Sequence, residues 1–208
     1  MPKNLLAGGI AVITALVLSA CSSSDHPSMP GMSAGSSAPA PSPSGQAAGH
    51  NADDIAFAQQ MVPHHSQALD MAKLVPSRST NPKVIDLASR IEKAQDPEIR
   101  QMQGWLTTWG APSASSMPGM DHGSMPGMSG SMPGMMSDAD MQKLGQAKGA
   151  EFDRMWLDMM IKHHQGAIDM AKTELSKGSD ADAKALAQKI IDAQQAEITE
   201  MQGLLQQS

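Results

Sequence analysis

Two short stretches of this chain, 99 residues apart, each place a methionine three and four residues before a pair of adjacent histidines. On a helix, residues with these offsets share a face, so each thioether is expected to lie beside both imidazoles. Thioether sulfur prefers Cu(I), and imidazole accepts copper readily. The stretches at 61–71 and 160–170 therefore predict a soft-metal site, with the candidate ligands Met61, His64, His65, Met71, Met160, His163, His164 and Met170.

Eight of the 19 methionines lie in Ser-Met-Pro-Gly-Met units, one at 28–32 and three more at 116–120, 124–128 and 131–135. Segments this rich in serine, proline and glycine cannot bury enough apolar surface to fold, so core packing does not explain these methionines. Each unit holds two sulfurs three residues apart, close enough to share one ion. The additional candidate ligands are Met117, Met120, His122, Met125, Met128, Met132 and Met135. The alternative is low-complexity drift in a linker.

Helical periodicity occupies most of the remaining chain, from about 53 to 75, 82 to 109, 137 to 175 and 180 to 206. Asn51 or Asp53 is expected to cap the first of these helices, and Val75-Pro76 to end it. The second half repeats the first without a gap: nine of 20 residues are identical between 54–73 and 153–172, and eleven of 23 between 84–106 and 183–205. The sequence therefore predicts an all-α fold, a four-helix bundle made of two duplicated helical hairpins.

Carboxylates recur on the apolar stripes of both repeats and need a partner if they are buried. The candidate buried acidic residues are Asp54, Glu98, Asp153 and Glu197. Adjacent histidines point about 100° apart on a helix, so one of each pair is expected to bond Glu98 or Glu197 while the other lies at the edge of the bundle. Such a pairing would explain the histidines without a metal, just as core packing would explain the helical methionines.

The N-terminus has the layout of a secretory signal, with Lys3, an apolar stretch at 5–18 and then Leu-Ser-Ala-Cys. This ending resembles the bacterial lipoprotein cleavage box, which implies that Cys21, the single cysteine, becomes lipidated and anchors the mature protein outside the cytoplasm. A membrane-spanning helix is the alternative, but about 14 apolar residues are short for a bilayer span.

Composition and segment boundaries complete the expected organisation. The net charge of −6 and the absence of a basic patch argue against nucleic acid as a partner. We expect a signal peptide at 1–20, a lipidated flexible tether at 21–50, a helical hairpin at 51–110, a Met/Pro/Gly-rich loop at 111–136 and a second hairpin at 137–208. The two hairpins would form one domain.

The pattern Asp-x-x-Phe/Trp-x-x-x-Met-x-x-His-His-x-x-Ala-x-x-Met-Ala, present in both halves, resembles the bacterial family known as domain of unknown function 305. The resemblance covers about 51–208 except the Met-rich insertion. It implies a ferritin-like four-helix fold, and the association of some members with copper and silver implies metal ligands among the methionines and histidines of 61–71 and 160–170.

Taken together, these observations predict a membrane-anchored extracytoplasmic lipoprotein, not an enzyme, that binds Cu(I) and Ag(I) for sequestration or delivery to a copper-handling partner. Such a site would weaken as imidazole protonates below its unperturbed pKa of about 6.5. A structural lipoprotein without metal is the main alternative. A di-iron oxidase is the other, although the chain has Met-x-x-His where such bundles carry Glu-x-x-His.

Overall fold

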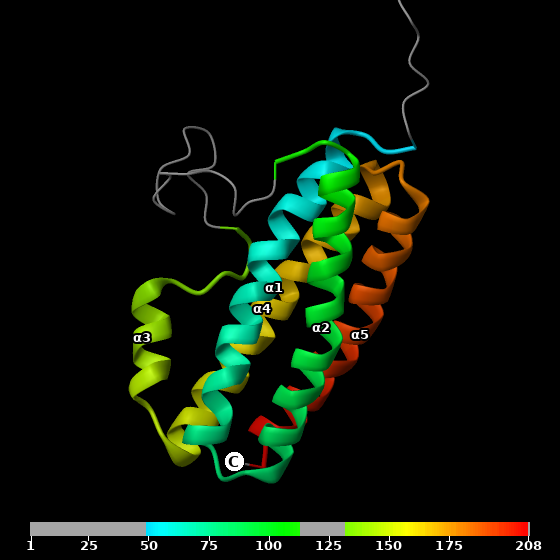
Figure 1. The fold of residues 1–208 in the computed structure, drawn as a ribbon. Helices are drawn as coiled ribbons and strands as arrows, with labels where there is room; N and C mark the ends of the chain where they lie inside the picture. The colour runs from blue at the N-terminus through cyan, green and yellow to red at the C-terminus, as the bar shows by residue number, and fades with distance from the viewer. Residues whose placement is uncertain (1–48, 113–131, 208) are drawn as a thin grey trace, which may run out of the picture. The chain divides into compact units, whose positions relative to one another are not determined.

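The computed structural model describes residues 49–112 and 132–207 of the 208-residue chain (Figure 1). Within these ranges the backbone is all-α and contains no strand. The helices in chain order are α1 (Ala52–Arg78), α2 (Pro82–Thr108), α3 (Asp138–Gln146), α4 (Gly149–Lys177) and α5 (Ala181–Leu205).

Side chains at the helix starts explain why the helices begin where they do. Asn51 caps α1 in a reciprocal capping box with Asp54, and Ser137 does the same for α3 with Asp140. Asp180 accepts hydrogen bonds from two backbone amides in the first turn of α5. Asn51 is one of the two caps expected from the sequence.

Helix α1 ends later than the sequence indicated. We expected Val75-Pro76 to stop it, but the helix continues to Arg78 and closes with a hydrogen bond from the Ser79 amide to the Val75 carbonyl. Pro76 lacks an N–H and crowds the carbonyl four residues earlier, but the residues after it still have their own amides, so the helix can continue for another two residues. The prediction was therefore wrong at this boundary, although the helix itself was predicted.

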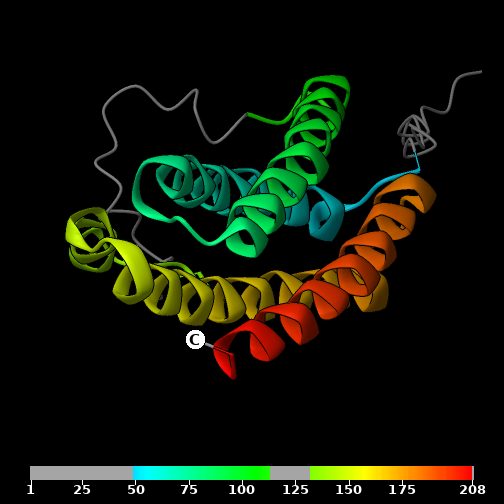
Figure 2. The same ribbon diagram turned by 90° about the horizontal axis from the view of Figure 1, so that it is seen from below.

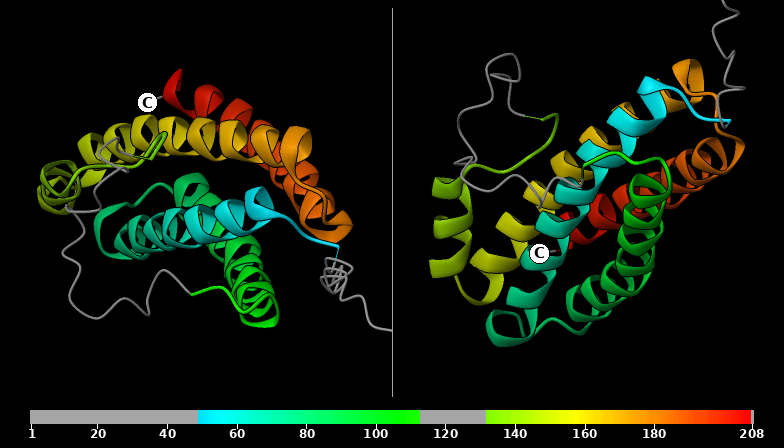
Figure 3. Two further views of the ribbon diagram at one scale, coloured as in Figure 1. Left: turned by 90° about the horizontal axis from the view of Figure 1, so that it is seen from above. Right: turned by 45° about the horizontal axis from the view of Figure 1, so that its top comes forward.

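The four long helices form two hairpins, α1 with α2 and α4 with α5, and α1 packs against α4 between them. Figures 2 and 3 show the hairpins as two layers, α1 and α2 in one and α4 and α5 in the other. The start of α1 meets the end of α4, where Asn51 Nδ2 donates to Lys177 O at 2.8 Å. Helices α1 and α4 therefore run antiparallel, as do α2 and α5, which Arg90 and Glu200 join by an ion pair of 2.5 Å.

Aliphatic and methionine side chains form most of the core, as the scarcity of aromatic residues indicated. The two large aromatic exceptions in α4, Phe152 and Trp156, are fully buried. Trp156 Nε1 donates a hydrogen bond of 3.0 Å to the carbonyl of Met71, so it joins α4 to α1 as well as filling space.

The helical pattern that begins near 137 is divided between two helices. Helix α3 ends at Gln146, and α4 begins at Gly149, whose φ of 59° allows the chain to turn. Helix α3 packs against α4, and its Leu144 side chain is fully buried. The second hairpin therefore starts at α4, and α3 is an additional helix with no equivalent in the described residues 49–112.

None of the helices in the described ranges has both the length and the apolar character needed to cross a bilayer.

Candidate metal centre

Four histidines lie at the centre of the contact between α1 and α4, and all four are completely buried. The rings of His64 and His163, which occupy equivalent positions in the two repeats, stack with centroids 3.7 Å apart and a tilt of 34°. We expected one histidine of each pair at the edge of the bundle, and this was wrong. Each helix is covered on both sides, by the opposite hairpin and by its own partner helix, so both histidines of each pair are enclosed.

The second histidine of each pair turns toward its own hairpin partner. His65 Nε2 lies 3.0 Å from Glu98 on α2, and His164 Nε2 lies 2.7 Å from Glu197 on α5. Lys189 Nζ lies 3.3 Å from the other oxygen of Glu98, so that this carboxylate also bridges the two hairpins. Both glutamates bond a histidine as expected, although only Glu98 is buried and Glu197 is partly exposed.

These contacts fix which ring nitrogen carries the proton. A carboxylate or carbonyl oxygen only accepts, so Nε2 donates in His65 and His164 toward glutamate and in His64 toward the Pro133 carbonyl, 3.0 Å away. Within the described part of the chain, the Nδ1 atoms of these three rings have no hydrogen-bond partner, and neither ring nitrogen of His163 has one. The oxygen acceptors therefore satisfy only Nε2 of His64, His65 and His164, and a buried lone pair remains on each Nδ1.

Burial makes these imidazoles harder to protonate. Burial first, and then the nearby charge of His65, lower the pKa of His64 to about 3, although the Pro133 carbonyl acts in the opposite direction. Burial and the neighbouring histidines also hold the pKa of His163 well below its usual range, and they outweigh the opposing effect of the His64 backbone. Burial lowers the pKa of His164 despite the opposing effect of Glu197. These three imidazoles are neutral at pH 7, the form that binds metals.

The four helical methionines predicted as ligands are all buried in the core. Met61, Met71 and Met160 are fully covered, and Met170 is 7% exposed. Met61 and Met170 pack in one apolar cluster, while Met71 and Met160 pack in the other. Packing therefore accounts for their burial, and a role as ligands remains a prediction that rests on their helical spacing from the histidines.

One of the Met-Pro-Gly-Met units approaches the histidines directly. Pro133, between Met132 and Met135, supplies the carbonyl that accepts from His64. The remaining loop candidates and the lipidation site lie outside the described residues: Met117, Met120, His122, Met125, Met128 and Cys21.

Asp54 joins the two hairpins away from the histidines. Its carboxylate accepts from the Ser179 and Asp180 amides at the start of α5, at 3.0 and 2.9 Å. Burial alone would raise the pKa of Asp54, but hydrogen bonds from the Asn51, Asp180 and Ser179 backbones outweigh burial and lower it to about 2. Its counterpart Asp153 is also buried, and Asp153 Oδ1 has no partner among the described residues.

Glu174 is a buried carboxyl that the sequence did not single out. It is 1% exposed, and burial together with adjacent Asp54 raises its pKa to about 8. A Cβ on Gly178 would overlap the carboxyl of Glu174, so the glycine leaves the space that this group occupies. The signal that could have identified Glu174 is the comparison of the repeats: a charged residue stands where the first repeat has the apolar Val75.

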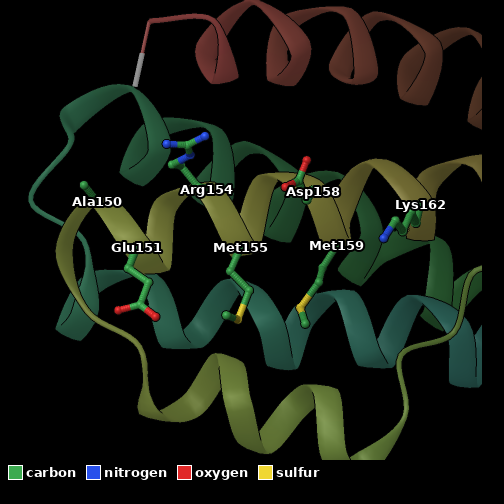
Figure 4. A pocket seen from close by; sticks show the side chains of 7 residues that line it. All are labelled: Ala150, Glu151, Arg154, Met155, Asp158, Met159 and Lys162. Atoms are coloured by element: carbon green, nitrogen blue, oxygen red, sulfur yellow. The ribbon is translucent and has the colours of Figure 1, made fainter.

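A separate hollow of about 630 Å³ lies along α4 (Figure 4). Met155 and Met159, one helical turn apart, point to the same side of the helix there. Neither was among the predicted ligands, and both depart from the repeat, which has alanine and glutamine at the equivalent positions 56 and 60. The residues lining the hollow are Ala150, Glu151, Arg154, Met155, Asp158, Met159 and Lys162.

The described residues contain no group of three or more His, Cys, Asp or Glu side chains arranged to hold one ion. The candidate centre consists instead of paired imidazoles with free Nδ1 atoms, on helices that also carry buried thioethers.

The fold and this centre define an all-α protein built from two repeats that meet through their histidine pairs. Residues 54–205 match the family described as Domain of unknown function (DUF305), and the chain belongs to this family.

Solved structures of similar sequence extend the comparison. A candidate secreted DUF305 protein of Streptomyces coelicolor is 35% identical, with a TM-score of 0.66 over 74% of this chain and 93% of that one. A DUF305 fragment from Deinococcus radiodurans is 34% identical, with a TM-score of 0.65 over 76% and 98%. CopM in its Cu(I)-bound form is 30% identical, with a TM-score of 0.58 over 74% and 96%, and CopM is also solved in Cu(II)-bound and Ag-bound forms.

A match to a curated protein is much shorter. An uncharacterized protein of Acanthamoeba polyphaga mimivirus is 42% identical over 54 residues, which is 26% of this chain and 36% of the viral protein. The matched part is thus about a third of that relative.

Proposed function

We propose that this chain binds soft metal ions, Cu(I) and also Ag(I), outside the cytoplasm, for sequestration or delivery. The observation that carries the proposal is the set of buried Nδ1 atoms on His64, His65 and His164, which have no partner in residues 49–112 and 132–207, while an oxygen holds each Nε2 proton. Metal-binding histidines characteristically donate their other N–H to a carboxylate or a carbonyl. The metal-bound forms of CopM support the same conclusion.

The proposed ligand set combines these imidazoles with thioethers. Met61 and Met160 lie three residues before His64 and His163 on their helices, and Met132 and Met135 flank the Pro133 carbonyl. Imidazole with thioether suits Cu(I) and Ag(I), which accept few and soft ligands. The Met-rich units would capture ions, and the buried centre would retain them.

The location and architecture belong to the same proposal. Lipidation of Cys21 would anchor the protein to the membrane, with residues 21–50 as a tether and the four long helices as a ferritin-like bundle interrupted by the 111–136 loop. The description of the Streptomyces coelicolor relative as a candidate secreted protein supports a position outside the cytoplasm.

Anaerobic titration of the full-length chain with Cu(I), against a competing chelator and with bound metal counted by mass, tests the proposal. We expect tight binding, and we expect His64→Ala/His163→Ala to weaken it by about tenfold or more, the effect typical of disturbing a metal site. His50→Ala is the control, because His50 stacks on Trp109 outside the centre. Circular dichroism would verify that each variant folds.

The possible results separate the alternatives. Cu(I) binding that survives loss of both histidines but disappears when Met132 and Met135 become leucine would place the function in the loop. If the wild-type chain does not compete for Cu(I) at all, the structural lipoprotein becomes the better account.

A further inference from the structure

Residues 132–136, the end of the Met-rich loop, lie docked against α1 and α4. His64 Nε2 donates to the Pro133 carbonyl at 3.0 Å. Gln67, one turn further along α1, makes two hydrogen bonds with Met136: its Nε2 donates to the Met136 carbonyl at 2.9 Å, and its Oε1 accepts from the Met136 amide at 2.8 Å. Every one of these contacts is made to the backbone of the turn.

Two glycines make this approach possible. Gly134 has a φ of 78°, and a Cβ there would lie 2.5 Å from the Lys162 carbonyl on α4. A Cβ on Gly166 would overlap the carbonyl of Pro133, so the missing side chain forms a notch in α4 that receives the turn. A glycine inside a helix costs roughly 1 kcal/mol relative to alanine, which is consistent with a specific need for space here.

The notch and the glutamine occupy equivalent positions in the two repeats. Position 67 is glutamine in the first repeat, and its counterpart 166 is glycine in the second. A second, equivalent binding site for a turn would need glycine at position 67 and glutamine at position 166. The two repeats have therefore diverged to hold one turn between them, and His163, the counterpart of His64, has no such acceptor among the residues that the structure describes.

The docked turn accepts a hydrogen bond from Nε2 of His64, as the glutamates do from His65 and His164. The Pro133 carbonyl holds the proton on His64 Nε2, as Glu98 does for His65 and Glu197 does for His164. In all three rings Nδ1 is left as the buried lone pair. The turn therefore positions His64 for coordination through Nδ1 and brings Met132 and Met135 to the same part of the molecule.

We propose that the groove formed by His64, Gln67 and Gly166 is a binding site for the Met-Pro-Gly-Met turn at 132–135, and that its occupancy is coupled to metal binding at the histidines. This inference rests on the proposed function for its metal, but the docking itself does not. Coupling is reciprocal: the factor by which docking tightens metal binding equals the factor by which metal tightens docking.

Hydrogen exchange of the Met136 amide in the full-length, metal-free chain measures docking. We expect Gly166→Ala and Gln67→Ala each to speed this exchange about tenfold, the effect of losing one or two hydrogen bonds. Gly104→Ala and Gln101→Ala are the matched controls, because Gly104 has open space around it and Gln101 is exposed. Unchanged exchange in both test variants would overturn the docking site.

The same four variants, titrated with Ag(I), measure the coupling. We expect Ag(I) to slow exchange of the Met136 amide in the wild type. We expect the two test variants to lose Ag(I) affinity by the factor by which Ag(I) slows this exchange, while the two controls keep the wild-type affinity. Faster exchange with unchanged Ag(I) affinity would overturn this inference alone. A wild-type chain that binds no Ag(I) would overturn the proposed function together with the coupling.

Discussion

The pKa values of His64, His163 and His164 are lower than that of free histidine, and this changes the expected response of metal binding at these rings to pH. From the sequence we expected binding to weaken below the unperturbed pKa of about 6.5. Burial lowers the pKa of His64 to about 3 and holds that of His163 well below its usual range. Protons therefore compete with metal at these rings only at much lower pH.

Metal loading at His64 and His163 should consequently remain nearly constant from pH 7 to pH 5. Ag(I) binding measured by calorimetry across this range checks the expectation, in a variant with Met132 and Met135 changed to leucine to remove the described loop thioethers. A loss of about tenfold per pH unit below 6.5 would indicate that ordinary, exposed histidines bind the ion instead.

Glu174, in contrast, is expected to make the folding stability of the protein depend on pH within this range. Its pKa is about 8 in the folded protein, against 4.5 ordinarily, so its contribution to stability is complete below pH 4.5 and is lost as the pH rises to 8. Glu174→Gln cannot ionise. We expect the variant to gain stability over the wild type as pH rises from 5 to 8, by up to about 1.4 kcal/mol per unit.

Urea unfolding of wild type and Glu174→Gln at pH 5, 6.5 and 8 measures this difference, with the exposed Glu151→Gln as the control. A difference in unfolding free energy that does not change with pH would mean that Glu174 ionises normally in the folded protein.

At the level of residues, a helical repeat is the signal that sequence can carry. The spacing of methionine and histidine placed the candidate centre on two helices, but it did not reveal that His64 would meet His163, because that depends on how α1 crosses α4. Gln67, Gly166 and Glu174 were missed for a related reason. At each of these positions one repeat departs from the other, so the agreement between repeats that marks the histidines does not mark them.

At the scale of helices, the duplication has produced equivalent carboxylates with different structural roles. Asp54 completes the capping box of α1 and accepts from the Ser179 and Asp180 amides at the start of α5. Asp153, its counterpart, is buried with Oδ1 unpartnered among the described residues. Asp54 therefore connects the N-terminal ends of two helices from different hairpins.

Asp54→Ala should accordingly destabilise the protein by about 2–4 kcal/mol, the combined cost of losing a cap and buried hydrogen bonds to a charged group. Asp153→Ala should cost clearly less. Thermal or urea unfolding at pH 5, where Glu174 retains its proton, gives the comparison without ionisation of its neighbour. Equal losses in the two variants would show that the cross-hairpin contacts of Asp54 add little.

Most helices could be predicted because apolar periodicity and caps such as Asn51 are local signals. The separate α3 was not, although Ser137 and Asp140 form a capping-box pattern at its start. The docked turn at 132–136 was also beyond prediction, since the sequence around it resembles a linker. Its conformation depends on contacts with Gln67 and Gly166, which are distant in the chain.

On the scale of the whole molecule, two hairpins meet through their most polar buried residues. A contact between repeats could have been wholly apolar, yet four imidazoles occupy it, together with the carboxylate or carbonyl acceptors of His64, His65 and His164. Burying polar nitrogens without partners is costly. A bound soft ion would satisfy those nitrogens and join the hairpins at the same time, which links the stability of the fold to its cargo.

The central claim is that metal binds through the Nδ1 atoms that the acceptors leave free. The most direct test is the ¹⁵N spectrum of the histidine rings in the full-length chain during titration with Ag(I). The account predicts that Nδ1 signals of His65 and His164 shift while their Nε2 signals remain those of protonated nitrogens. Ring signals that do not move as Ag(I) binds, or coordination that replaces the proton on Nε2, would contradict it.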